Sequence, residues 1–115
     1  MHEVSLASGI LKIVEAAALR EKFARVTLLR IEAGSLCNVE VRALRFALEV
    51  MAQDTCLQDA EIAIDTPTGA AWCLHCQLTV PLQAHGDACP QCGNYQLRAT
   101  GGAELRVLEM MVEDT

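Results

Sequence analysis

The sequence predicts a small α+β fold, a helix–strand–helix–strand–strand domain with an inserted four-cysteine, zinc-ribbon-like module. Apolar residues recur at helical spacing in two segments and occupy strand-like segments in three others. Between the last two of these strands, residues 67–101 hold four cysteines, all three prolines and the single Trp and Tyr of the chain. A chain of 115 residues is long enough for one domain with a small appendage.

The first helix is predicted over residues 5–18, with Ser5 as its N-terminal cap. A strand follows over residues 23–34, and it ends at Gly34. The helix is predicted from apolar residues at helical spacing: Leu6, Ile10, Ile13, Val14 and Ala17. The strand is predicted from β-branched and aliphatic residues: Val26, Thr27, Leu28, Leu29 and Ile31.

After a loop over residues 35–38, a second helix is predicted over residues 39–52, with Asn38 as its cap. Its apolar face is formed by Leu44, Ala47, Leu48 and Met51. Two further strands are predicted over residues 60–66 and 104–113. Turn-forming segments at 67–69 and 100–102 separate residues 1–66 and 102–115, the α/β domain, from the module at 67–101.

Composition and charge exclude several classes of protein. Apolar residues make up 52% of the chain and aromatic residues 3%, so the core must be aliphatic. A net charge of −6 argues against a nucleic-acid partner, which requires a basic surface. No apolar run reaches the roughly 18 residues that span a membrane, and no basic start leads into an apolar core. We therefore expect a cytoplasmic protein, in which paired cysteines are more often metal ligands than disulfides.

The module contains two C-x-x-C pairs, Cys73 with Cys76 and Cys89 with Cys92. Two residues between cysteines allow both sulfurs of a tight turn to face one ion, and four thiolates form the tetrahedral set that zinc accepts. So short a segment cannot bury enough apolar surface to fold alone. Zinc binding can supply about 10–16 kcal/mol toward folding in comparable peptides.

A redox pair of the thioredoxin type and an iron–sulfur centre are the competing interpretations of these cysteines. The redox interpretation expects a single C-x-x-C beside a βαβ pattern, and two pairs in a turn-rich segment do not fit it. Because four protein ligands leave no open position, the predicted zinc is structural and not catalytic.

Four further residues could contribute to a site. His75 and His85 are expected to be exposed loop residues, with replacement of a thiolate or pH tuning of the site as the alternative. Cys37 and Cys56 flank the second helix and are expected to be small core residues or surface thiols.

The chain starts with Met1, His2 and Glu3, which are either solvated residues ahead of the first helix or ligands of a metal ion. The Met1 amine, the deprotonated His2 amide and the His2 Nδ1 form two fused chelate rings, and the Glu3 amide can supply a fourth nitrogen. Four coplanar nitrogens suit Ni(II) or Cu(II) and not zinc. The Glu3 carboxylate can orient His2 or add an axial oxygen. This chelate requires that Met1 is retained, which a bulky second residue favours.

Three features together resemble the HypA/HybF family of hydrogenase nickel-incorporation proteins: the start MHEVSLASGI, the two spaced cysteine pairs, and the order of helices, strands and module. The resemblance covers essentially the whole chain. It implies a nickel metallochaperone and not an enzyme, with Ni(II) bound through His2 assisted by Glu3, and Zn(II) held by the four cysteines. The implied partners are the GTPase HypB and the large subunit of nickel–iron hydrogenase, and in some organisms urease maturation proteins.

The main alternative is a zinc-ribbon protein-interaction module that does not deliver nickel. An enzyme that uses zinc or a thiolate is a third interpretation. It is disfavoured because neither an open zinc position nor a Cys/His/Asp constellation is apparent outside the module.

Overall fold

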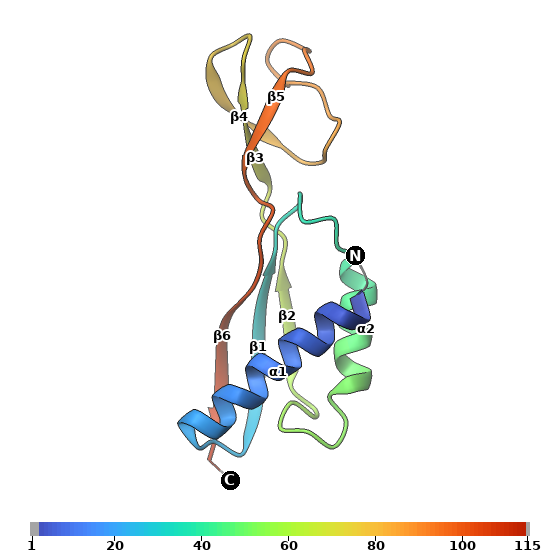
Figure 1. The fold of residues 1–115 in the computed structure, drawn as a ribbon, viewed down its shortest axis with the longest axis vertical. Coiled ribbons are helices and arrows are strands. Elements are labelled where there is room, and N and C mark those ends of the chain that lie inside the picture. The colour runs from blue at the N-terminus through green and yellow to red at the C-terminus, as the bar shows by residue number, and fades with distance from the viewer. Residues whose placement is uncertain (1–2, 115) are drawn as a thin grey trace. The chain divides into compact units, whose positions relative to one another are not determined.

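The computed structural model of the protein describes residues 3–114. It contains two helices and two three-stranded sheets, and it confirms the predicted α+β class (Figure 1). In chain order the elements are α1 (Glu3–Glu21), β1 (Arg25–Ala33), α2 (Val41–Met51), β2 (Glu61–Asp65), β3 (Gly69–Cys73), β4 (Leu78–Leu82), β5 (Leu97–Gly101) and β6 (Leu105–Glu113). None of the helices described has the length and apolar character that crossing a membrane requires.

The chain forms two compact units. The helical unit comprises residues 3–31, 39–64 and 107–114, and the cysteine unit comprises residues 32–38 and 65–106. The cysteine unit therefore contains the whole predicted module together with a short segment that precedes α2 in the chain.

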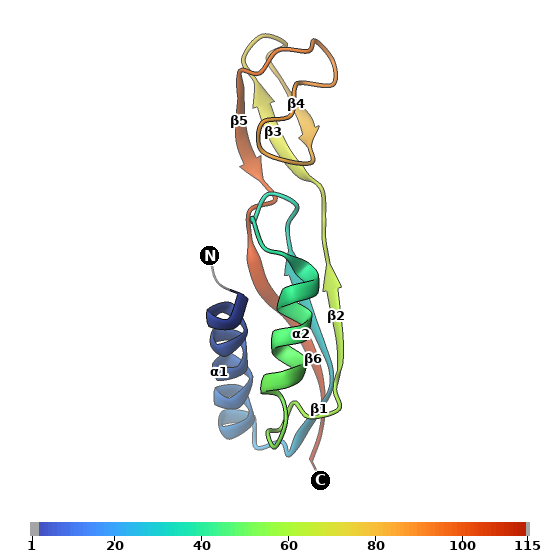
Figure 2. The same ribbon diagram turned by 90° about the vertical axis from the view of Figure 1, so that its right-hand side faces the viewer.

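In the helical unit, β1 is the central strand of the sheet β2-β1-β6. Both helices lie on the same side of this sheet (Figures 1 and 2), and α1 packs against α2. The core is aliphatic as predicted except for Phe23: Ala7, Ile10, Val14, Ala17, Phe23, Val26, Leu29, Ile31, Leu44, Ala47, Leu48, Ala52, Leu57 and Ile62. An ion pair of 3.1 Å between Arg30 and Glu109 links β1 to β6 on the exposed surface.

Both predicted helix caps are wrong. Ser5 lies inside α1, which already includes Glu3, and the acidic side chain in the first described turn is favourable beside the helix dipole. Helix α2 is capped by Glu40, whose carboxylate accepts the N–H of Arg42 at 3.0 Å. Asn38 instead has a φ of 59° and turns the chain ahead of the cap, a conformation that Asn tolerates better than most residues.

The cysteine unit contains a second antiparallel sheet, in the order β4-β3-β5. Cys73 at the end of β3 lies opposite Leu78 of β4 and Leu97 of β5. A small core of Leu36, Ala71 and Leu82 packs beside a second cluster of Cys73, Val80 and Cys89. The segment 32–38 thus contributes a buried leucine to the sheet that carries the cysteines.

Three glycines in the cysteine unit pack backbone against backbone. A Cβ atom at Gly34 would overlap the carbonyl group of Gly102, and one at Gly102 would overlap the Cα of Gly69. Gly102 also has a φ of +93°, which L-residues rarely adopt. These positions therefore require glycine both for space and, at Gly102, for backbone conformation.

Candidate metal centre

The two C-x-x-C turns of the cysteine unit share a backbone hydrogen bond. In the first, the N–H of Gln77 donates to the carbonyl of Cys73 at 2.8 Å, and in the second the N–H of Gly93 donates to the carbonyl of Cys89 at 2.9 Å. The donor residue has a positive φ in both turns, 55° at Gln77 and 78° at Gly93. The two turns therefore share this backbone hydrogen bond and the positive φ of the residue that follows the second cysteine.

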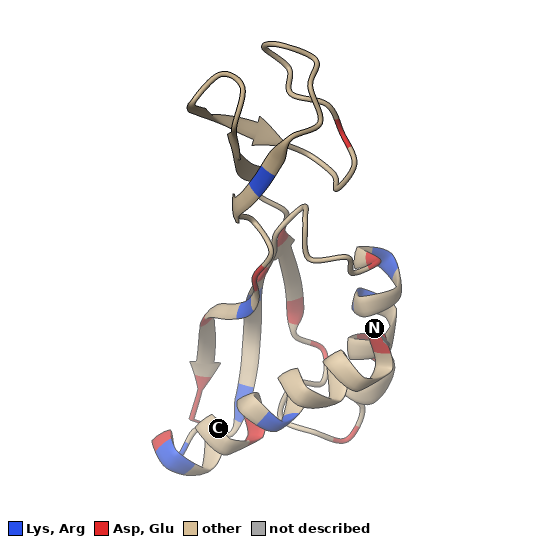
Figure 3. Cartoon of the chain, turned by 45° about the horizontal axis from the view of Figure 1, so that its top comes forward, with Lys and Arg blue, Asp and Glu red and all other residues tan. Residues whose placement is uncertain are grey.

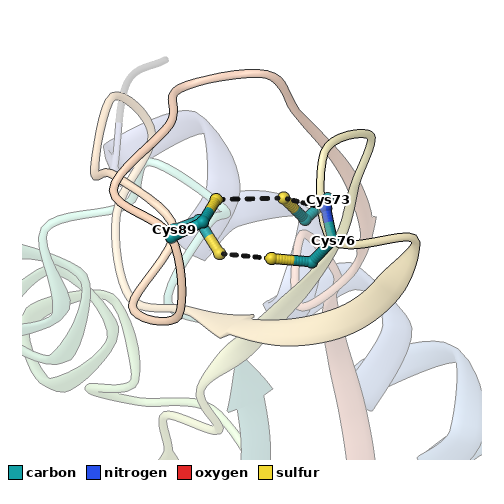
Figure 4. Close-up of side chains that lie close together, drawn as sticks. Cys73, Cys76 and Cys89 are labelled. Atoms are coloured by element: carbon teal, nitrogen blue, oxygen red, sulfur yellow. Dashed lines mark hydrogen bonds between the residues drawn. The ribbon is translucent and has the colours of Figure 1, made fainter.

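The two turns bring the four thiols together. All four Sγ atoms lie within 4.8 Å of one another, with 3.7 Å between Cys73 and Cys92 and 4.0 Å between Cys76 and Cys89. Figure 4 shows the thiols of Cys73 and Cys76 facing the sulfurs of the second turn, where Cys89 is labelled. A tetrahedral zinc ion with Zn–S bonds of about 2.3 Å places its sulfurs about 3.8 Å apart. The spacing therefore fits a four-thiolate metal ion.

N–H donors surround three of the sulfurs. Backbone N–H groups of Cys76 and Gln91 donate to the Sγ atoms of Cys73 at 3.3 Å and Cys89 at 3.4 Å. The side-chain amide of Asn94 donates to the Sγ of Cys92 at 3.5 Å. Such donors stabilise thiolate charge and orient metal ligands.

The metal-free thiols do not ionise alike. The backbone N–H of Asn94 lowers the pKa of Cys92 to about 6, whereas hydrogen bonding with the Cys92 thiol raises the pKa of Cys76 to about 12. One sulfur thus takes the first negative charge, and the neighbouring thiol retains its proton in response. Metal binding must displace that proton.

The remaining Cys and His candidates lie outside this cluster. His75 is exposed on the first turn, and His85, also exposed, has its Nε2 3.2 Å from the carbonyl oxygen of Leu36. Cys37 and Cys56 are half-buried free thiols. Within residues 3–114, the only group of three or more such ligands close enough to hold a metal is the four-cysteine cluster.

The predicted nickel ligands at the amino terminus are described only in part. Met1 and His2 lie outside the described residues, and Glu3 lies in the first described turn of α1. Glu3 also lines a mostly apolar groove of about 580 Å³ between the start of α1 and α2. Its other walls are Val4, Ser5, Ala43, Phe46, Ala47, Val50 and Met51.

Two features of this geometry were not predicted. Asn94 contacts a ligand sulfur, and its position two residues after the second C-x-x-C pair is the signal that could have identified it. On α2, Phe46 and Val50 are 69% and 51% exposed, on a face separate from the buried Leu44 and Leu48. Their spacing of four residues is a visible sign of a second apolar stripe.

The amino-acid sequence was compared with those of known proteins, and it matches one family over nearly its whole length. Residues 1–112 match the family model described as "Hydrogenase/urease nickel incorporation, metallochaperone, hypA". The chain is 61% identical over 114 residues to the hydrogenase maturation factor HypA of Cupriavidus necator, covering 99% of this chain and 96% of that protein. It is 59% identical over 114 residues to that of Polaromonas naphthalenivorans, covering 99% of each chain.

Solved structures share the fold. The solution structure of the Ni metallochaperone HypA from Helicobacter pylori has a TM-score of 0.68 and 20% sequence identity, covering 98% of each chain. A second structure, described as the solution structure of HypA protein, has a TM-score of 0.71 with 20% identity and covers 100% of this chain and 98% of that one. The chain therefore belongs to the HypA family of hydrogenase and urease nickel-incorporation proteins, which are metallochaperones and not enzymes.

Proposed function

We propose that this protein binds Ni(II) at its amino terminus and delivers it during maturation of nickel–iron hydrogenase, while the four cysteines hold a structural Zn(II). The observation that carries the proposal is membership of a nickel-incorporation family over residues 1–112, a match that includes Met1, His2 and Glu3. The proposed nickel ligands are the Met1 amine, the amide and Nδ1 nitrogens of His2, and Glu3.

The position of Glu3 in α1 supports this ligand set. The first four N–H groups of a helix have no intrahelical acceptor, so the Glu3 nitrogen can coordinate a metal without breaking a helical hydrogen bond. The positive end of the helix dipole disfavours a bound cation, and the Glu3 carboxylate offsets that effect. A site in which the helix dipole weakens metal binding and a carboxylate strengthens it suits a protein that must release its metal as well as bind it.

Zinc is the proposed ion of the cysteine centre because four thiolates at tetrahedral spacing are its preferred structural ligands. The sulfur donors suit zinc, whereas planar nitrogen donors suit Ni(II). The two sets therefore separate the two metals by chemistry. With four protein ligands present, the zinc supplies folding free energy and leaves no coordination position for a substrate.

Delivery requires that an acceptor approach the nickel ligands. The apolar groove beside Glu3 offers a partner a binding surface at that position, with Val4 64% exposed and Phe46 69% exposed. The proposed partners are a HypB-type GTPase, the large subunit of nickel–iron hydrogenase and, in a urease-producing cell, urease maturation proteins. We propose that the protein acts in the cytoplasm.

A nickel titration of the protein with its native amino terminus tests this proposal. Absorption spectroscopy should show the band of square-planar Ni(II), saturating at one nickel per chain. A matched chain with a few residues added ahead of Met1 should lose most of this binding, because its Met1 nitrogen becomes an amide. Equal nickel affinity in the two chains would exclude the amine as a ligand. A native chain that holds zinc but no nickel would instead support the zinc-ribbon interaction module.

A further inference from the structure

We propose that Cys76 is the reactive ligand of the metal-loaded four-thiolate centre, the sulfur that electrophiles alkylate first, and that Asn94 protects its counterpart Cys92. The inference rests on the proposed zinc site. It goes beyond that proposal because it ranks sulfurs that an ideal tetrahedral site would make equivalent.

Cys76 and Cys92 can be compared directly because they occupy equivalent positions in the two turns. Cys76 and Cys92 are the second cysteines of turns with matching backbone hydrogen bonds and matching positive φ at the next residue. Both cysteines are half-buried, whereas the first cysteines, Cys73 and Cys89, are 0% and 2% exposed. Access to reagents therefore favours the second cysteine of each turn and does not by itself separate the two.

The difference lies two residues further along the chain. After Cys92 this position is Asn94, whose Nδ2 donates to the Cys92 Sγ at 3.5 Å. The carbonyl oxygen of Asn94 also accepts the N–H of Cys89 at 2.8 Å, which holds its backbone in place. After Cys76 the equivalent residue is Leu78, which begins β4 and has no side-chain donor. In the described part of the chain, no N–H group donates to the Cys76 Sγ, whose neighbours are the other three sulfurs of the cluster, with that of Cys89 at 4.0 Å.

A hydrogen bond to a thiolate lowers the energy of the electron pair that attacks an electrophile. With iodoacetamide, that pair forms the new C–S bond, and iodide leaves with the electrons of the C–I bond. The product is a thioether, which is a poor zinc ligand, so alkylation opens the site. A single hydrogen bond of ordinary strength changes a rate by about threefold to tenfold, and we expect Cys76 to react faster than Cys92 by that factor.

The experiment measures initial alkylation of the zinc-loaded full chain by iodoacetamide, with the modified cysteine identified by peptide mass spectrometry. Native mass spectrometry first establishes one zinc per chain. Asn94→Leu removes the side-chain donor to Cys92 and leaves the backbone N–H of that residue in place, so it should raise the Cys92 rate toward that of Cys76. Leu78→Asn is the reciprocal variant, at a side chain that is 43% exposed, and should slow alkylation of Cys76.

Either variant is sufficient if the other fails to fold. Faster alkylation of Cys92 than of Cys76 in the unaltered protein, or equal rates for both, would overturn the inference, as would variants that leave the ratio unchanged. A chain that binds no zinc contradicts the proposed zinc site itself. A zinc-loaded chain with the wrong order of reaction contradicts only the ranking of its sulfurs.

Discussion

Individual residues determine whether the cysteine unit can close around its ligands. Leu36 is 2% exposed, and it packs against Ala71 and Leu82 of the cysteine-bearing sheet. Ser35 donates its hydroxyl to the carbonyl of Leu82 at 3.4 Å and accepts the N–H of Gly69 at 2.9 Å. These contacts hold the segment 32–38 against β3 and β4, and the closely packed glycines leave no room for a side chain between them.

We expect Gly34→Ala to lower the free energy of unfolding by about 1–3 kcal/mol, the usual cost of forcing atoms into a packed site. Its new Cβ would overlap the Gly102 carbonyl, which is backbone and cannot rotate away. Gly9→Ala, inside α1 with nothing within 4 Å, is the control and should stabilise by about 0.5–1 kcal/mol. Urea unfolding measures both, and equal stabilities would refute the steric argument.

At the scale of secondary-structure elements, the sequence predicts that a helix is present better than it predicts where the helix starts. The apolar faces of α1 and α2 are strong signals, and both helices are present. Ser5 and Asn38 have the side chains of capping residues, but Ser5 lies inside α1 and Glu40 caps α2. Strands β3, β4 and β5 were not predicted inside the module, because five-residue strands among turn formers give little periodicity.

Loss of one thiol should unfold the cysteine unit selectively. In Cys73→Ala, we expect zinc binding and the order of residues 67–101 to be lost, while α1 and α2 persist because their core is made of other residues. Trp72, the only Trp in the chain, lies on β3 next to the ligand and reports on this unit through its fluorescence. Circular dichroism reports on the helices.

Cys37→Ala is the matched control, since Cys37 lies outside the thiol cluster. It should keep both the zinc and the Trp72 emission of the unaltered chain. A Cys73→Ala protein with native Trp72 emission after chelator treatment would show that the unit folds without its metal.

On the scale of the whole molecule, most charged residues lie outside the segment that contains the four clustered cysteines. The segment 67–101 has two charged residues, Asp87 and Arg98, and the other charged residues lie outside it (Figure 3). The spacing of the cysteines was enough to predict the thiol cluster, since each C-x-x-C turn is local. The groove beside Glu3 was not predictable, because it requires α1 and α2 to pack together.

The central claim is that nickel and zinc occupy separate sites with different donors. Metal counting by native mass spectrometry, on chains with the native amino terminus equilibrated with both ions, tests it most directly. We predict one nickel and one zinc in the unaltered protein, and in His2→Ala one zinc, no nickel and an unchanged circular dichroism spectrum. Nickel bound by His2→Ala as fully as by the unaltered protein would contradict this account.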